Sequence, residues 1–153
     1  MRLIDTYKKA HPHAQPSELF MLIATARIAR RDAIRLSERK AAQGRAPVYM
    51  YLFSWKSPAL EGRLRAPHTV EIPFVFDNTD IPAVMTKSPS AKPLAEKTSS
   101  AWIAFARTGN PNHAGLPKWP AYTTAERTTM VFDTVCEAVN DPDRAEREAW
   151  AQT

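Results

Sequence analysis

Glycine is scarce in this chain, whose 153 residues include only 4 glycines beside 13 prolines. An average protein contains about 7% glycine and about 5% proline. No two of the glycines have the spacing of a dinucleotide-binding loop, a P-loop or a Gly-x-Ser-x-Gly nucleophile elbow; they are Gly44, Gly62, Gly109 and Gly115. The sequence therefore excludes a glycine-rich phosphate cradle and a serine elbow from this chain.

Cysteine and long apolar runs are also missing. Cys136 is the single cysteine, so the chain has no intramolecular disulfide and no pair of cysteines at zinc-finger spacing. The first nine residues lack the apolar run of a signal peptide, and no 18 apolar residues follow one another as a membrane-spanning helix requires. We expect a soluble chain without a membrane partner, and the sequence leaves its compartment open.

The net charge of +5 is concentrated in one short stretch. Residues 27–45 hold seven basic and two acidic side chains, so the rest of the chain is neutral. This stretch has no aromatic residue on which a base could stack, and its charges recur at helical spacing. A solvated helix face explains the charge, and we expect no nucleic-acid partner.

Apolar periodicity predicts a helical region over 17–43. The apolar residues from Leu19 to Leu36 form one stripe, which a break near Thr25 could interrupt. Ser17 could cap the start, and Gly44 could end the last turn in a left-handed conformation.

The remaining pattern alternates strands and helices within 1–153, which we expect to form one segment. Residues 48–55 predict a strand buried on both faces, and 71–76 predict either an edge strand or a short helix-like turn because Pro73 lacks a donor. Further along the chain we expect a helix over 94–108, with Phe105 in its inner stripe, a strand over 128–133 and a charged terminal helix over 141–151. Two or three strands among three or four helices predict an α/β fold with an incomplete sheet, because a doubly buried strand needs neighbours that this chain lacks.

Histidine is the residue type here that suits acid–base chemistry. His11, His13 and His113 lie in proline-rich loops and do not supply the three or four ligands of a metal site. His68 differs because it follows a predicted strand and its connection, and reactive groups gather at the carboxyl ends of strands in α/β sheets. A lone loop histidine is nevertheless more often structural than catalytic.

His68 lies in one of four motifs that together resemble a known family. They are PVYMYLFSW at 47–55, APHTVEIPFVF at 66–76, WIAFARTGNPN at 102–112 and WPAY at 119–122. In this order they resemble the C-terminal part of the type-B carboxylesterases, the α/β-hydrolase family of the cholinesterases and p-nitrobenzyl esterases. The resemblance implies that 47–76 contains the last central strand and the histidine loop, and that 1–153 is a C-terminal α/β-hydrolase segment.

The resemblance also implies roles for individual residues. His68 matches the catalytic histidine, which takes the proton of a serine hydroxyl and returns it to the leaving alcohol. Glu71 matches a structural position, and we interpret it as one half of an ion pair that fixes the loop. Thr69 stands where the family usually has glycine, and a β-branched residue is poorly suited to a positive φ angle.

A serine nucleophile and a triad acid are expected upstream of the histidine in this fold, and the 67 residues before His68 contain no serine elbow. The leading hypothesis is thus a carboxylic ester hydrolase of the serine type, without metal or cofactor, whose N-terminal part is missing, so that this chain alone is catalytically incomplete. Its partners would be a small carboxylic ester and either the missing N-terminal part or a second copy of the chain. The alternative hypothesis is a non-catalytic remnant or protein-interaction module that associates through an exposed sheet edge.

Overall fold

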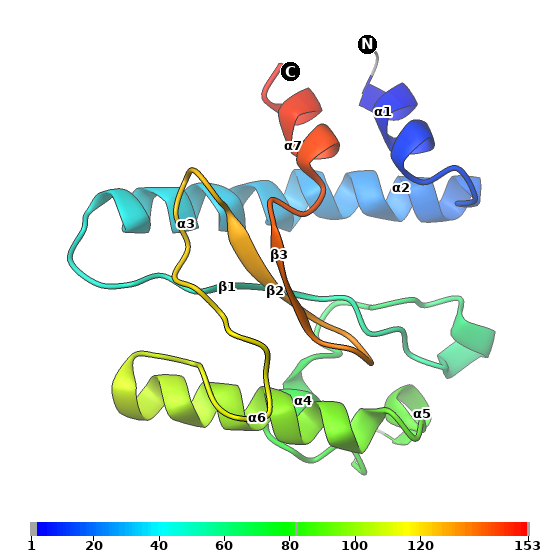
Figure 1. Ribbon diagram of the computed structural model, residues 1–153. Helices are drawn as coiled ribbons and strands as arrows, with labels where there is room; N and C mark the ends of the chain where they lie inside the picture. The colour runs from blue at the N-terminus through cyan, green and yellow to red at the C-terminus, as the bar shows by residue number, and fades with distance from the viewer. Residues whose placement is uncertain (1–2, 82, 153) are drawn as a thin grey trace. The chain divides into compact units, whose positions relative to one another are not determined.

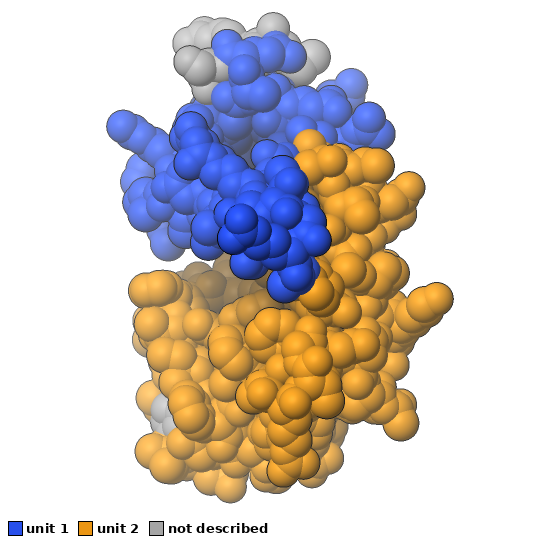
Figure 2. Space-filling model, turned by 90° about the vertical axis from the view of Figure 1, so that its left-hand side faces the viewer, with its two compact units in different colours: residues 1–46, 141–153 blue, residues 47–140 orange. Residues whose placement is uncertain are grey.

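The computed structural model describes residues 3–81 and 83–152, which form two compact units (Figure 2). One unit comprises residues 1–46 together with 141–153, and the other comprises 47–140. No helix among the described residues is long and apolar enough to cross a membrane.

The first unit is helical. Its elements are α1 (Leu3–Ala10), α2 (Pro16–Thr25), a π-helical segment (Ala26–Arg30), α3 (Arg31–Ala42) and α7 (Arg144–Trp150). The helical region expected over 17–43 therefore lies at 16–42, and its break is the π-helical segment that begins one residue after Thr25. Gly44 has a φ of +62° and follows the last turn, as its sequence position predicts.

The start of α2 differs from the prediction that Ser17 caps it. Pro16 occupies the first helical position, for which its fixed φ is already suited. The backbone N–H of Gln15 donates to the Glu18 carboxylate at 2.8 Å. Gln15 is thus the capping residue and Ser17 lies inside the first turn.

Side chains from both ends of the chain connect the helices of this unit. The His11 imidazole lies 3.0 Å from the Glu146 carboxylate, and the Trp150 indole donates to the Tyr7 hydroxyl at 2.8 Å. Two arginines of the basic stretch also have partners: Arg30 pairs with Asp143 at 3.0 Å, and the Arg31 guanidinium lies 4.6 Å from the centre of the Trp150 ring. These contacts join α7 to the other helices of its unit.

The second unit contains the sheet (Figure 1). Its strands are β1 (Met50–Phe53), β2 (Thr128–Phe132) and β3 (Glu137–Asn140), in the order β1-β2-β3. β1 runs parallel to β2, whereas β3 is antiparallel to it. The helical elements of this unit are a 3-10 turn (Ala59–Gly62), α4 (Ile72–Val75), α5 (Ala83–Thr86) and α6 (Ala91–Thr108).

The observed elements confirm an α/β fold with a small sheet and correct its details. The prediction of three or four helices is too low, because seven α-helical segments occur in the described residues, two of them only four residues long. β1 is shorter than 48–55 and is not buried on both faces, since only Met50 is buried and the next three residues are half-buried. The reason is its edge position, with β2 as its one neighbour among the described strands.

The core of this unit lies between the sheet and the helices α4 and α6. Trp55, Phe74, Leu94, Met130 and Phe132 are all at most 2% exposed. α6 presents its inner stripe to this core with one exception, because Phe105 is 45% exposed. Gly109 ends α6 with a φ of +74°, the left-handed conformation expected of a glycine in this place.

Candidate functional site

His68 lies in the turn between the 3-10 segment and α4, in the connection that leaves the carboxyl end of β1. The turn is fixed on the side that follows the histidine. Val70 is 6% exposed, and its N–H donates to the Pro67 carbonyl at 3.1 Å. Phe74, one turn into α4, is fully buried between the rings of Phe53 and Trp55, with ring centres 4.9 Å from each.

The imidazole of His68 itself is exposed. No hydrogen bond or ion pair joins it to any residue that the structure describes. In particular, no carboxylate and no serine hydroxyl of the described chain contacts it. The histidine is therefore held by its backbone and not oriented by a side-chain partner within residues 3–81 and 83–152.

The backbone around His68 is unusual. Five residues other than glycine have a positive φ between positions 60 and 77, namely Leu60, Glu61, Arg65, Thr69 and Asp77. Such conformations cost about 1–3 kcal/mol each and cluster at functional sites. The strain is therefore concentrated in the loop that carries the histidine.

Thr69 has a φ of +73°, directly after His68. A β-branched residue is poorly suited to this left-handed conformation, but Thr69 adopts it. Its hydroxyl donates to the His68 carbonyl, and its own carbonyl accepts the N–H of Ile72 at 3.1 Å. The turn thus keeps a shape that suits glycine although a threonine occupies it.

Glu71 does not form the ion pair interpreted from the sequence. Its backbone carbonyl accepts the N–H groups of Phe74 and Val75 in α4, but its carboxylate has no basic partner among the described residues. Together with burial, which has the larger effect, its negative charge raises the pKa of the Tyr51 hydroxyl. Glu71 therefore contributes to this loop through its backbone carbonyl, which accepts hydrogen bonds from α4.

A second polar pair lies at the carboxyl ends of the two parallel strands. The Ser54 hydroxyl donates to the Asp133 carboxylate at 2.8 Å. Each of the two residues directly follows a strand, but nothing in the local sequence pairs them. No histidine contacts either side chain in the described chain, and the hydrogen bond links the carboxyl ends of β1 and β2.

The other histidines have structural partners or lie exposed. His113 bonds through Nε2 to the Lys97 carbonyl at 3.0 Å, and His11 pairs with Glu146. His13 is exposed. Within the described residues no group of three or more His, Cys, Asp or Glu side chains could hold a metal ion.

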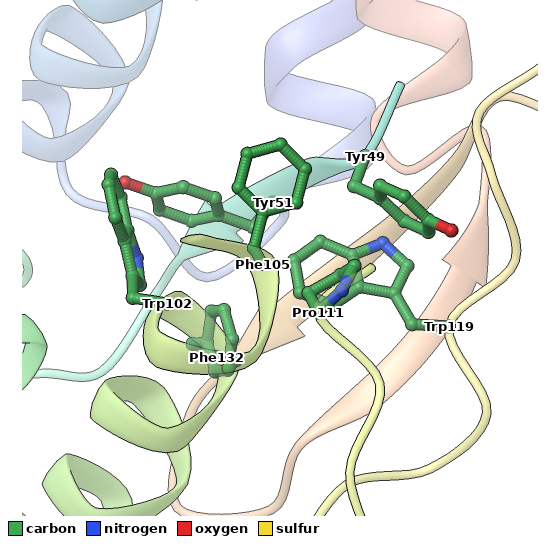
Figure 3. A pocket seen from close by; sticks show the side chains of 8 residues that line it. Tyr49, Tyr51, Trp102, Phe105, Pro111, Trp119 and Phe132 are labelled. Carbon is green, nitrogen blue, oxygen red and sulfur yellow. The ribbon is translucent and has the colours of Figure 1, made fainter. Parts of the chain in front are cut away.

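Trp119 belongs to a loop that hydrogen bonds keep in place. Asn112 accepts the Trp119 N–H at 2.7 Å through Oδ1 and donates to the Trp119 carbonyl at 2.8 Å through Nδ2. The indole then packs edge-on against Tyr49 and Phe132, with ring centres 5.8 Å apart in both pairs. The motifs at 102–112 and 119–122 thus meet at Trp119, which packs against Tyr49 before β1 and against Phe132 of β2 (Figure 3).

The three-stranded sheet with helices packed against it is a portion of an α/β-hydrolase fold, and comparison with known proteins identifies the family. The Carboxylesterase family matches residues 3–150. The chain therefore belongs to the carboxylesterase family.

Individual relatives agree with this assignment. The chain is 40% identical over 108 residues to the para-nitrobenzyl esterase of Bacillus subtilis, covering 67% of this chain and 21% of the relative. It is 38% identical over 104 residues to the phenmedipham hydrolase of Pseudarthrobacter oxydans, covering 63% of this chain and 20% of the relative. These curated relatives are about five times longer than the region they share with this chain.

Solved structures extend the similarity to nearly the whole chain. The carboxylesterase EST55 of Geobacillus stearothermophilus has a TM-score of 0.80 at 38% identity, over 97% of this chain and 31% of that protein. A thermophilic PNB esterase gives a TM-score of 0.73 at 32% identity, over 96% of this chain and 30% of that protein. The fold described here is thus a portion of the carboxylesterase fold.

Proposed function

We propose that this chain supplies the histidine-bearing portion of a carboxylic ester hydrolase, with His68 as the general base and acid. The place of His68, in a strained turn after the parallel strand β1 of a carboxylesterase-family chain, carries the proposal. The exposed imidazole is available to a serine and an acid that lie outside the described residues.

The proposed reaction is an acyl transfer in two steps. His68 accepts the proton of a serine hydroxyl as its oxygen attacks the ester carbonyl, and then donates that proton to the departing alcohol. In the second step it accepts a proton from water, whose oxygen attacks the acyl-enzyme, and returns the proton to the serine as the acid is released. The serine, the triad acid and the oxyanion donors belong to the part of the carboxylesterase fold that this chain does not span.

Hydrolysis of p-nitrophenyl acetate tests the proposal in two preparations. Purified 1–153 should hydrolyse this ester no faster than free imidazole at the same concentration, because it lacks a nucleophile. A fusion of the N-terminal portion of the Bacillus subtilis para-nitrobenzyl esterase to this chain should hydrolyse it, and His68→Ala should lower kcat about 10²–10⁴-fold.

His13→Ala is the matched control, since His13 is an exposed loop histidine in the other unit. It should leave the rate of the fusion unchanged. A fusion that keeps its rate after His68→Ala contradicts the assigned role of His68. Rapid, His68-dependent hydrolysis by purified 1–153 contradicts the claim that the other catalytic groups lie elsewhere.

A further inference from the structure

The backbone of its turn determines where His68 lies, because no hydrogen bond or ion pair joins its imidazole to a residue that the structure describes. The turn runs from Pro67 to Val70, whose N–H donates to the Pro67 carbonyl at 3.1 Å. Thr69 has the positive φ that the third residue of a type II turn requires. Burial of Val70 and Phe74 fixes the side of the turn that follows the histidine. The side that leads into the histidine depends on a separate anchor.

Ser57 lies where the chain that leads into the histidine turn closes on itself. Its backbone N–H donates to the Arg65 carbonyl at 2.8 Å, and this bond joins the two ends of the segment 57–65. Arg65 has a φ of +54°. A strained conformation of this kind persists only where other contacts determine it. The hydrogen bond from Ser57 is one such contact.

Few backbone rotations separate Arg65 from His68. The two residues between them are Ala66 and Pro67. A proline fixes its own φ at about −65° and restricts the residue before it to extended conformations. A shift of the Arg65 carbonyl would therefore reach the histidine, because the chain between them has little freedom to absorb it.

The Ser57 side chain attaches this segment to α5. The residue is 1% exposed, and its hydroxyl donates to the Met85 carbonyl of α5 at 2.5 Å while accepting the Ala59 N–H at 3.2 Å. The last residue of α5 is the buried Thr86, whose hydroxyl donates to the Thr79 carbonyl. All of these partners belong to the unit 47–140. Ser57 thus joins a segment before His68 to one that follows it.

From these contacts we infer that Ser57 is a positioning residue for His68. Its hydroxyl holds the entrance of the histidine turn against α5, and the Arg65 carbonyl passes this restraint on to the imidazole. Ser57 itself takes no part in the chemistry. The inference rests on the proposed function, because the place of the imidazole affects acyl transfer only if His68 moves the proton. A displacement of about 1 Å can slow a reaction about a hundredfold.

Thr98 offers a matched control for the loss of a buried hydroxyl. It is also 1% exposed, and its hydroxyl donates to the Leu94 carbonyl at 2.9 Å. Both residues of this pair lie in α6, so the bond does not involve the histidine turn. Thr98→Val and Ser57→Ala each remove one buried hydroxyl donor, and the two variants should lose stability for the same physical reason.

Amide hydrogen exchange in purified 1–153 tests the anchor without any catalytic activity. Ser57→Ala should speed exchange of the Val70 amide at least about tenfold more than exchange of the β2 amides, because the turn loosens locally while the sheet does not. Thr98→Val should not raise this ratio. Exchange at Val70 that changes only in step with β2 in both variants overturns the proposal.

Steady-state kinetics test the effect on His68 in the fusion to the N-terminal portion of the Bacillus subtilis para-nitrobenzyl esterase. With p-nitrophenyl acetate, Ser57→Ala should lower kcat about tenfold or more and change KM by less than about twofold, because a displaced imidazole impairs proton transfer and not ester binding. Urea unfolding measures the folded fraction at the assay temperature, to which kcat is referred. Thr98→Val should leave both constants unchanged. An unchanged kcat in Ser57→Ala, or an equal loss in Thr98→Val, overturns the proposal.

Ser57→Cys is a milder variant, which decides the question if the Ser57→Ala chain does not fold. A thiol is a weaker hydrogen-bond donor than a hydroxyl. In the fusion, kcat should therefore fall at unchanged KM, but by less than the loss expected for Ser57→Ala. A kcat equal to that of the parent, or a rise in KM alone, overturns the proposal.

The two measurements separate this inference from the proposed function. If His68→Ala leaves the rate of the fusion unchanged while Ser57→Ala frees the Val70 amide, the proposed function fails together with the catalytic effect of the anchor, and the anchor itself stands. If hydrolysis depends on His68 but not on Ser57, the proposed function stands and the positioning role fails.

Discussion

At the scale of single residues, the loop that carries His68 is defined by conformations its own sequence disfavours. Thr69 holds a φ of +73° beside the histidine, and four other non-glycine residues between 60 and 77 are also left-handed. A strained conformation persists only where the surrounding contacts determine it. Here the buried side chains of Val70 and Phe74 hold the turn after His68.

Thr69→Gly should stabilise the folded chain by about 1 kcal/mol, because glycine accepts a positive φ without a clash and the gain exceeds its greater entropy in the unfolded state. The free energy of unfolding in urea measures the change. Thr124→Gly is the control, since Thr124 is exposed and has no positive φ. It should be neutral or destabilising, and an equal gain at both positions would contradict the strain at Thr69.

Ser57→Ala should destabilise the chain by about 1–3 kcal/mol, because the buried Ser57 hydroxyl would no longer donate to the carbonyl of the half-buried Met85 or accept the Ala59 N–H. Ser57 is 1% exposed, and its hydroxyl donates to the Met85 carbonyl at 2.5 Å while accepting the Ala59 N–H at 3.2 Å. Thermal unfolding followed by circular dichroism measures the loss. A variant as stable as the parent would show that this hydroxyl does not hold the segment between β1 and the 3-10 turn.

Alkaline pH should lower the stability of the fold, because folding raises the pKa of two side chains. Burial raises the pKa of the Cys136 thiol above 9.0 and that of the Tyr51 hydroxyl above 10.0. A group whose pKa is raised on folding stabilises the fold fully below its unfolded pKa, and this stability is lost as the pH rises through the folded pKa. The melting temperature should therefore fall above pH 9. Cys136→Ala should reduce that fall, and an unchanged pH profile would contradict the assignment.

At the scale of elements, helices followed the sequence more closely than strands did. The periodicity of 17–43 and the glycines at positions 44 and 109 predicted where the long helices lie, because a helix is determined by residues three or four apart. β3 was not predicted, and the edge position of β1 was inferred only as a lack of neighbours. Strand pairing joins residues 79 positions apart, such as Met50 and Thr129, and no local pattern encodes that choice.

Gly109→Ala should destabilise α6 by about 1 kcal/mol, because an L-residue at a φ of +74° meets its own carbonyl. No atom lies within 4 Å of the Cβ that alanine would add, so the loss is conformational and not steric contact with a neighbour. Gly109→Asn should lose less, since asparagine tolerates this conformation better. Urea unfolding distinguishes the two variants, and equal losses would contradict this cause.

At the scale of the whole molecule, the two compact units differ in how they are held together. The core cluster around Trp55, Phe74 and Phe132 lies entirely within 47–140, together with all three strands. The other unit needs both ends of the chain, because α7 supplies the partners of Tyr7 and His11, and Asp143, directly before α7, pairs with Arg30.

Residues 47–140 expressed alone should therefore keep a cooperative thermal transition, whereas residues 1–46 alone should not. The first piece retains its whole core, and the second loses the Trp150 and Glu146 contacts that close its helices. Circular dichroism melts of both pieces measure the difference. A cooperative transition in 1–46 would contradict the role given to α7.

The sequence by itself determined the family, the long helices and the turn that carries His68, because motifs and helical periodicity depend on residues close together in the chain. Only the tertiary structure decided that Thr69 is left-handed, that Glu71 has no basic partner in the described chain and that Ser57 bonds to segments on both sides of His68. These properties depend on which distant segments meet. Packing and strand pairing select those contacts from many that the local sequence permits.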